Sequence, residues 1–584
     1  MKTSYRQRFS QSYSSPYTSP SEDIRAVVAI DFGTTYSGFA YANKVSPREI
    51  EINSRWSGRE GLPKTNTVLL YDSTCTEVLK WGEPALVHEP RRNRNNVREL
   101  GSPLPPQQHV AEKFKLHLDE NAERLFLPPN LDYRKAISDY LRKMKGVIEE
   151  TLDKRWPGLK LSQVLFVLCV PAEWKPHTKA IMRDCAYKAG LLNDTIESHL
   201  EFTTEPEAAA LHCLSVIEEH NLIEGDTYLV VDCGGGTVDL TMRTIQSGKK
   251  LKEETERTGD LCGSTYVDQE FIDFMGRTVG FTALQRLRSY AYGDLQKLVH
   301  RFFCENVKLP FTGDPDEFET IELDLERQCP SLIKYITGAE RTNLENNEWI
   351  IELEFETVKK MFDPVVEKII KLINDQLLDL KEHRKCMAMF LVGGFSESPY
   401  LRKRIRERFQ ERVPIIASPR QPIAAIVKGA VKYGLDMSIV ESRVLKWTYG
   451  VEVKADFDIR NDPQRLRTND NKIWKFDLLA VRGAPVAVNQ TFSKEYKPLG
   501  ANQTMAVFQV YITKETRPRY IKDAGMRILG TLKIALSRTP SLGRERPVEF
   551  GLTFGTMEIK ATAKNKVTGE IYHTTFELDV KGKK

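Results

Sequence analysis

The sequence of 584 residues has no long hydrophobic run and no secretory signal. Its longest apolar stretch, Val164 to Ala172, is less than half as long as the ~20 residues that a membrane-spanning helix needs. The first 23 residues are polar and lack the apolar segment of a signal peptide. We therefore expect a cytoplasmic protein with no membrane partner, and we leave access to the nucleus open.

Strong charge and metal-ligand clusters are also missing. The net charge of +5 is small for this length, so we expect no nucleic-acid partner. The nine cysteines are scattered, without a Cys-x-x-Cys pair or the Cys and His spacing of a zinc site. This distribution predicts reduced thiols and no transition-metal centre.

Composition divides the chain into four parts. Residues 1–23 are rich in Ser and Tyr and predict a disordered tail, because they cannot bury enough apolar surface to offset the entropy of ordering. Residues 24–435 mix short apolar runs with helical patterns, which is typical of an α/β region. Residues 436–447 are predicted to be a linker. Residues 448–584 alternate apolar and polar residues around turns, which predicts a β-rich domain.

Two short stretches place an acid, small residues and hydroxyl groups between predicted strands. Asp31 lies in "VVAIDFGTTYSGFAYA", and Asp232 lies 201 positions later (232 − 31) in "YLVVDCGGGTVDLTMR". Glycines in such turns let backbone N–H groups converge on an anion. Paired carboxylates suit Mg²⁺, which prefers oxygen ligands and keeps several waters. The repeat predicts two similar halves that hold a phosphate chain between them.

A third glycine turn follows in "MFLVGGFSESPYLRKRIRERF", which reads as a strand, Gly393 and Gly394, and then a helix. Ser398 is a suitable helix cap, and Pro399 suits the first helical position. The two glycines would let a flat group such as a nucleobase approach closely. Taken alone, an ordinary strand-to-helix turn explains this stretch better.

Together the three stretches resemble the ATPase superfamily of actin, sugar kinases and heat-shock-70 chaperones. The stretches "VPAEWKPHTKAIMRDCAYKAGL", "EFTTEPEAAAL" and "FCENVKLPFT", with "LGTLKIAL" and "GTMEIKATAKNKVTGE" near the C-terminus, narrow the resemblance to the heat-shock-70 family and its divergent twelve-A type. The resemblance covers almost everything after residue 24. It implies a two-lobed, actin-like ATPase domain with duplicated ribonuclease H-like halves, followed by a β-sandwich domain.

The resemblance also implies roles for individual residues. Mg²⁺ would be held through water by Asp31 and Asp232. The catalytic group would be Asp31, Lys115, Glu205, Asp232 and Thr237, with Lys113 as the alternative lysine. The residues that would bind ATP or ADP are Gly33, Thr34, Thr35, Tyr36, Gly234, Gly235, Gly236, Thr237, Asp239, Gly263, Glu305, Lys308, Gly393, Gly394 and Phe395. Pro171 matches the family's switch proline, and Lys179 replaces the arginine that couples it to the other domain.

Some residues depart from the family pattern. Leu309 stands where the chaperones have an arginine that stacks on adenine, and Phe395 and Glu397 replace a serine and an arginine. Adenine selectivity is therefore an open question. Charged residues enter the linker in "SIVESRVLKWTYG", from which we expect weaker coupling between domains. The chain ends soon after the last predicted hairpin, so we expect neither the helical lid nor the acidic tail of the chaperones.

Three functions remain after this comparison. The preferred one is an ATP-binding, slowly hydrolysing chaperone-like protein with nucleotide-controlled polypeptide binding. Slow turnover is expected because phosphoryl transfer asks mainly for positioning and charge neutralisation, and no strong covalent nucleophile is present. The second is a nucleotide-dependent scaffold or signalling module with negligible hydrolysis, and the third is a small-molecule kinase. Unfolded or extended polypeptides are the expected partners, while exchange factors and J-domain co-chaperones are left open.

Overall fold

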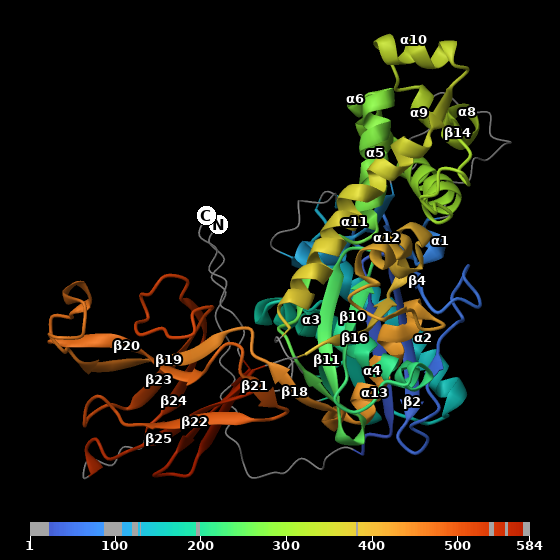
Figure 1. Ribbon diagram of the computed structural model, residues 1–584. Coiled ribbons are helices and arrows are strands. Elements are labelled where there is room, and N and C mark those ends of the chain that lie inside the picture. Colours follow the sequence, from blue (N-terminus) through green and yellow to red (C-terminus); the bar gives the residue numbers. More distant parts are fainter. Residues whose placement is uncertain are drawn as a thin grey trace.

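The computed structural model describes residues 23–86, 108–119, 127–128, 130–193, 199–380, 384–536, 542–554 and 559–575 (Figure 1). The predicted tail, apart from residue 23, and the last nine residues lie outside this set. Within the described part, the element order is mixed α/β up to α13 and almost entirely β after it. The structure thus changes from mixed α/β to β at the end of α13, at the start of the predicted 436–447 linker.

The first lobe is built on a six-stranded sheet with the order β3-β2-β1-β8-β9, in which β4 also pairs with β2. Strand β1 runs antiparallel to β2 and parallel to β8, and all of its side chains are buried. The turn after Asp31 therefore ends a central, fully covered strand. The strands are β1 (Ala26–Phe32), β2 (Tyr36–Asn43), β3 (Glu51–Ile52), β4 (Thr65–Asn66), β8 (Val164–Val170) and β9 (Leu200–Thr204).

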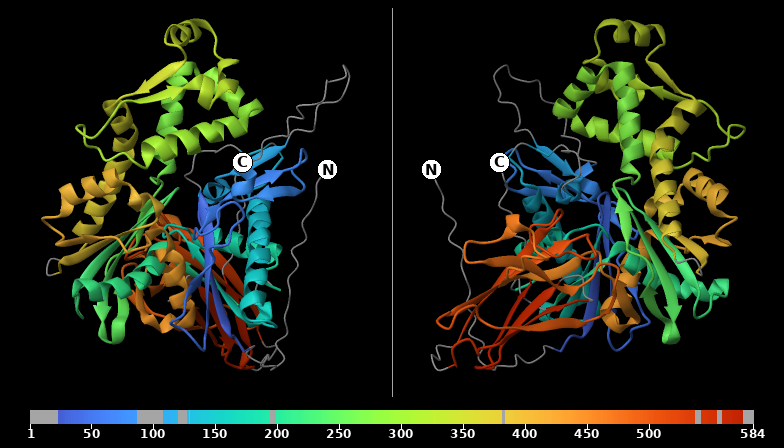
Figure 2. Two further views of the ribbon diagram at one scale, coloured as in Figure 1. Left: turned by 90° about the vertical axis from the view of Figure 1, so that its right-hand side faces the viewer. Right: turned by 60° about the vertical axis from the view of Figure 1, so that its left-hand side comes forward.

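The second lobe repeats this pairing scheme. Strand β10, which carries Asp232, runs antiparallel to β11 and parallel to β16 in an eight-stranded sheet. In both views of Figure 2 the two sheets stand side by side. The predicted duplication of the phosphate-turn hairpin is confirmed by this repeated topology. The strands are β10 (Thr227–Cys233), β11 (Val238–Gln246), β12 (Lys250–Glu253), β13 (Thr258–Asp260), β16 (Cys386–Val392), β17 (Ile415–Ala417), β18 (Val440–Val444) and β21 (Pro485–Ala487).

Two helices form the layer between the sheets. Helices α4 and α13 share one buried apolar cluster with side chains from β1, β8, β10 and β16. Gly429 allows this contact, since a Cβ there would lie 1.6 Å from the carbonyl oxygen of Ala208. Helices α2 and α3 cover the other face of the first sheet, and α5 and α11 cover that of the second. The bounds are α2 (Tyr133–Arg155), α3 (Pro176–Ala189), α4 (Glu205–Ile217), α5 (Thr265–Val279), α11 (Phe355–Leu378) and α13 (Ala425–Leu435).

Smaller elements extend each lobe. Strands β5 (Val68–Tyr71), β6 (Val78–Trp81) and β7 (His109–Glu112) form a separate sheet on the first lobe, with α1 (Glu83–Leu86) beside it. The second lobe continues upward in Figure 1 through α5, α6 and α11 to α10. Its further elements are α6 (Phe281–Tyr290), α7 (Tyr292–Lys297), a π-helix (Leu298–Lys308), β14 (Ile321–Asp324), α8 (Leu325–Gln328), α9 (Pro330–Ile333), α10 (Gly338–Asn346), β15 (Ile350–Leu353) and α12 (Pro399–Phe409).

The C-terminal part consists mainly of two antiparallel four-stranded sheets, ordered β20-β19-β23-β24 and β22-β25-β26-β27. One apolar cluster takes side chains from both sheets. The predicted final hairpin is confirmed, since β26 and β27 pair on both sides of the Thr568-Gly569 turn. The strands are β19 (Thr448–Asp456), β20 (Lys472–Ala480), β22 (Thr491–Tyr496), β23 (Met505–Thr513), β24 (Arg527–Ala535), β25 (Val548–Thr553), β26 (Lys560–Asn565) and β27 (Ile571–Thr575).

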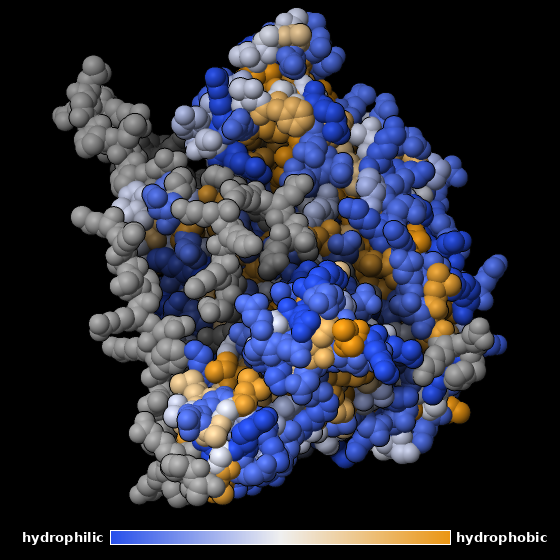
Figure 3. Space-filling view, turned by 90° about the vertical axis from the view of Figure 1, so that its left-hand side faces the viewer, coloured by the Kyte–Doolittle hydropathy of each residue, from blue (hydrophilic) through white to orange (hydrophobic). Residues whose placement is uncertain are grey.

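The stretch predicted to be a linker contains strand β18. This strand pairs with β12 in the second lobe and with β21, so it continues the second sheet. Figure 3 views the molecule from the side of the β-rich part, and the coloured surface there is mainly hydrophilic with small, separate hydrophobic groups. Among the described residues, no helix is both long and apolar enough to cross a bilayer.

Candidate functional site

The two predicted phosphate turns lie directly against each other. A Cβ added at Gly235 would lie 2.3 Å from the hydroxyl oxygen of Thr35, and one at Gly236 would lie 2.5 Å from that of Thr34. Turns that are 200 (235 − 35) to 202 (236 − 34) positions apart in the sequence therefore meet at the boundary between the lobes. A larger residue at either glycine would push the two hairpins apart.

Each turn is held by local contacts of its own. The Gly33 N–H donates to the Ser37 hydroxyl, and the Gly33 carbonyl accepts from the hydroxyl of Thr67. In the second turn, the carbonyl oxygens of the three glycines accept from the backbone N–H groups of residues 263–265. Because the carbonyl groups of these glycines accept hydrogen bonds from neighbouring segments, both glycine turns are held in a fixed conformation.

Buried charged groups surround the meeting point of the turns. Lys64 Nζ lies 2.5 Å from Asp31 Oδ2, and Lys115 Nζ lies 2.6 Å from Glu205 Oε1. Asp232 is 2% exposed, and its Oδ1 atom has no hydrogen-bond partner among the described residues. Asp239 lies opposite Asp232 in the strand register and is also buried. Four carboxylates against two ammonium groups leave two negative charges uncompensated when all are ionised.

These surroundings change the acidity of the carboxyl groups. Burial, together with the charges of Glu205, Asp239 and Asp31, raises the pKa of Asp232 well above its ordinary value. Burial and the charge of Glu205 raise the pKa of Asp239 to about 7, although the Ala172 N–H donates to its Oδ1 atom at 2.7 Å. Burial also raises the pKa of Glu205, against the effect of Lys115. The site is thus short of positive charge.

The residues present fit a magnesium ion. The unpartnered oxygen of Asp232 and the two surplus negative charges call for a cation with oxygen ligands. Among the described residues, no group of three or more acidic, histidine or cysteine side chains is arranged to ligate a metal directly. Mg²⁺ is commonly held in proteins through water and one or two carboxylates plus substrate phosphates.

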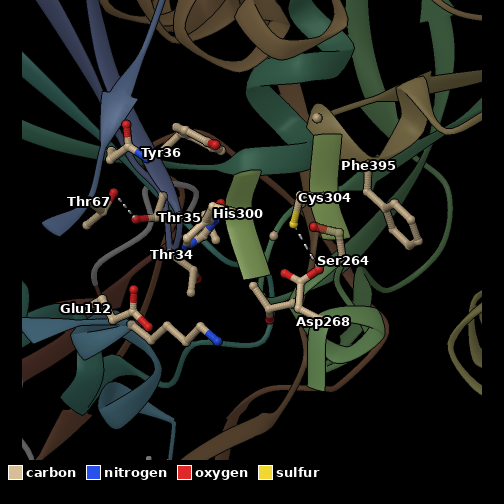
Figure 4. A pocket seen from close by; sticks show the side chains of 18 of the residues that line it. Thr34, Thr35, Tyr36, Thr67, Glu112, Ser264, Asp268, His300, Cys304 and Phe395 are labelled. Carbon is tan, nitrogen blue, oxygen red and sulfur yellow. Dashed lines mark hydrogen bonds between the residues drawn. The ribbon is translucent and has the colours of Figure 1, made fainter. Parts of the chain in front are cut away.

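A cavity of about 310 Å³ opens at this point between the lobes. Figure 4 shows Thr34, Thr35 and Tyr36 on one wall and Ser264, Asp268 and Cys304 on the facing wall. All predicted site residues except three line the cavity: Asp31, Gly33, Thr34, Thr35, Tyr36, Lys115, Glu205, Asp232, Gly234, Gly235, Gly236, Thr237, Lys308, Gly393, Gly394 and Phe395. Lys113, the alternative to Lys115, lines it too, but Lys115 makes the ion pair with Glu205.

The sequence is similar to heat-shock-70 proteins along nearly its whole length. It is 27% identical to mouse "Heat shock 70 kDa protein 12A" over 630 residues, which covers 94% of this chain and 91% of that protein. It is also 27% identical to human "Heat shock 70 kDa protein 12B" over 661 residues, covering 96% and 93% of the two chains. The chain is a homologue of the 12A and 12B heat-shock-70 proteins. The predicted resemblance is thereby confirmed.

More distant similarity reaches the bacterial chaperones. The homologue is 25% identical to "Chaperone protein DnaK" of Thermosipho africanus over 450 residues, which covers 74% of this chain and 63% of that protein. No protein-family model matches the chain. The mixed α/β architecture with duplicated hairpins fits the actin-like ATPase fold of this family.

Three predicted residues of this heat-shock-70 homologue do not line the cavity: Asp239, Gly263 and Glu305. Asp239 instead borders a smaller cavity beside Pro171. Gly263 supports the second turn, because a Cβ there would lie 2.4 Å from the carbonyl oxygen of Gly235. Glu305 is exposed on the π-helix.

At the far end of the cavity, the buried Lys308 is paired with Asp268. Lys308 is buried, and its ammonium group donates to Asp268 at 2.6 Å and to the Ser264 carbonyl at 2.9 Å. Burial is the largest single effect and lowers the pKa of Lys308, but the charge and hydrogen bond of Asp268, together with Cys304, outweigh it and raise the pKa. Phe395 is buried and lines the cavity, whereas Leu309 is 54% exposed at its edge.

Sequence reasoning missed the residues that complete the site from distant segments. Lys64, Asp268, Glu112 and Tyr292 all line the cavity. None lies in a glycine turn, and a lone lysine or acid in a loop or helix carries no local pattern. Lys64 and Asp268 pair within a lobe, with Asp31 and Lys308, whereas Glu112 and Tyr292 meet across the two lobes.

The linker strand is tied to the nucleotide lobe by a buried ion pair. The guanidinium of Arg443 donates to both oxygens of Glu207, at 2.9 and 2.7 Å, and Arg243 reaches the same carboxylate at 3.1 Å. Glu207 lies in the first turn of α4, two residues after Glu205. Arg443 of the charged linker is therefore packed into the protein core, whereas Glu441 is exposed.

Proposed function

We propose that the chain binds ATP or ADP with Mg²⁺ between its two lobes and hydrolyses ATP slowly. The observation that carries this proposal is the direct contact of two glycine turns beside a buried cluster of acids, in which one oxygen each of Asp232 and Asp239 has no hydrogen-bond partner among the described residues. A polyphosphate needs N–H donors and a cation; other N–H groups of the glycine turns would supply the donors, and the surplus negative charge suits a cation.

The chemistry would rest on positioning. Backbone N–H groups of the two turns would bind phosphate oxygens, and the Thr34, Thr35 and Thr237 hydroxyl groups would add donors. Glu205 is held by Lys115 at the cavity wall, where its free carboxylate oxygen can orient a water molecule. Bound Mg²⁺ would neutralise phosphate charge. The aspartates would keep the water shell of the ion in place.

We further propose that nucleotide state controls the β-rich part and its binding of extended polypeptide, with the two C-terminal sheets acting as a β-sandwich domain. The support is the chain of contacts from α4 to Arg443. A second series of hydrogen bonds runs from Asp239 through Ala172 to Lys446, since Lys446 Nζ donates to the Ala172 carbonyl at 3.1 Å. Both begin at residues of the phosphate site or its immediate neighbours.

A nucleotide-dependent scaffold with negligible hydrolysis is the second candidate. The ion pairs Lys64–Asp31 and Lys115–Glu205 favour it. Each lysine already binds a carboxylate, so it would have to bind that carboxylate and a phosphate oxygen at the same time. The kinase alternative has no specific support in the geometry.

One assay separates these functions. Purified protein is mixed with ATP and Mg²⁺, and phosphate release is followed with and without an unfolded polypeptide. Release that the polypeptide stimulates supports the proposal, and tight binding without release supports the scaffold. Release only with an added metabolite acceptor would instead indicate a kinase. The Asp232→Asn variant is the control that ties any activity to this site.

A further inference from the structure

Lys64 is a buried cation at the carboxylate that is expected to face the metal. Its side chain is 9% exposed, that of Asp31 is 2% exposed, and the two charged atoms are 2.5 Å apart. Lys64 also lines the cavity. A lysine in this position carries a fixed positive charge at the phosphate turn whether or not a metal ion is bound.

Three local features of the fold hold Lys64 in this position. Asp31 pairs with Gly38 in the β1–β2 register. A Cβ at Gly38 would lie 2.5 Å from the Pro63 carbonyl oxygen and 3.0 Å from Lys64 Cγ, so only glycine leaves room for this segment. The next residue, Thr65, pairs with Ser37 and fixes the backbone of Lys64 beside the hairpin. The ammonium group is therefore held in place by the sheet.

The charges around the cavity define what this lysine can do. Lys115 is engaged by Glu205, and Asp232 has an unpartnered oxygen. Polyphosphate entering next to unpaired carboxylates would be repelled unless a cation separated them. A lysine ammonium group has three donors, so Lys64 can keep its bond to Asp31 and donate another to a phosphate oxygen.

We propose that Lys64 is a phosphate-binding residue that lets this site hold a nucleotide without Mg²⁺. This inference rests on the proposed nucleotide binding and specifies its metal dependence. Because Lys64 already neutralises Asp31, only Asp232 among the two metal-facing aspartates needs the ion. Mg²⁺ then strengthens binding without being required for it.

The test compares nucleotide affinity with and without the metal in the full chain. ADP and ATP binding are measured by titration calorimetry in Mg²⁺ and in excess EDTA, and the ratio of the two Kd values is taken. We expect a ratio of about ten or less for the parent protein. For Lys64→Met the ratio should rise at least tenfold, while Lys64→Arg should keep the parent ratio. Lys143→Met, on the exposed face of α2, is the matched control.

The outcomes are distinguishable. An unchanged ratio in Lys64→Met overturns the role of Lys64, whereas absence of binding by the parent protein in Mg²⁺ overturns the proposed function itself. If Lys64→Met does not fold, Gly38→Ala replaces it, because the added methyl group displaces Lys64 without removing its charge. A raised ratio in Gly38→Ala then supports the proposal, and an unchanged ratio overturns it.

Discussion

At the scale of single residues, Asp239 is a buried acid whose ionisation opposes folding when no cation is near. Its pKa is raised to about 7, above the ordinary value of 3.8. Between these values the folded protein binds a proton that the unfolded chain has lost. The free energy of unfolding therefore falls as pH rises from about 4 through about 7, by at most about 1.4 kcal/mol per pH unit from this group.

This slope can be measured by urea unfolding in EDTA at a series of pH values. We expect the free energy of unfolding of the Asp239→Asn protein to fall less steeply with pH in this range, by the contribution of about one bound proton. Asp153, a solvent-facing acid on α2, gives the matched Asp153→Asn control, which should leave the slope unchanged. A slope identical in Asp239→Asn and the parent would show that Asp239 binds no extra proton in the folded state over this pH range.

The Lys115–Glu205 pair allows a second residue-scale prediction. Both side chains are less than 10% exposed, so removing one partner leaves the other charge buried and alone. Lys115→Met should lower the free energy of unfolding by about 3–5 kcal/mol, and Lys115→Met/Glu205→Gln should recover most of that loss. Urea unfolding of the two single variants and the double variant forms the cycle. Effects that add to within about 0.5 kcal/mol would mean that the groups are not paired.

At the scale of elements, the features that depend on adjacent residues could be predicted from the sequence. The acid-tipped turns after β1 and β10 and the Ser398 cap of α12, which accepts from the Leu401 N–H, could be predicted because each depends on adjacent residues. Strand β18 could not be predicted as a strand, because its partner β12 is nearly 190 positions away and its Arg443 is stable in the core only beside Glu207.

Arg443 is therefore predicted to fix β18 to the nucleotide lobe. Arg443→Met removes both bonds to Glu207, and hydrogen exchange of the backbone amides in β18 should become at least tenfold faster. Arg443→Lys should recover little of the protection, because a lysine cannot form the two-pronged contact. The control is Arg460→Met, since Arg460 is exposed in the β-rich part. Unchanged exchange in Arg443→Met would show that strand pairing alone holds β18.

At the scale of the whole molecule, the limits of prediction follow from assembly of the lobes. The two glycine turns could be predicted to meet, since a phosphate chain needs both. The residues that close the cavity from its sides could not, because Glu112 on β7 and Tyr292 on α7 come together only when the small sheet of one lobe faces the helices of the other. Such contacts depend on how the two lobes are placed relative to each other.

These contacts lead to a prediction about nucleotide exchange. The Glu112 carboxylate accepts hydrogen bonds from the Tyr292 hydroxyl at 2.5 Å and from Gln296 Nε2 at 2.9 Å, and all three residues line the cavity. If the lobes separate when a bound nucleotide leaves, these bonds must break. Each hydrogen bond to a charged group contributes about 1.5–3 kcal/mol, which corresponds to roughly tenfold or more in rate. Glu112→Ala should therefore accelerate release of a fluorescent ADP by about 10- to 100-fold in stopped-flow displacement, and Tyr292→Phe should do so by a smaller factor. If both variants release the nucleotide at the parent rate, opening of the lobes is not what limits exchange.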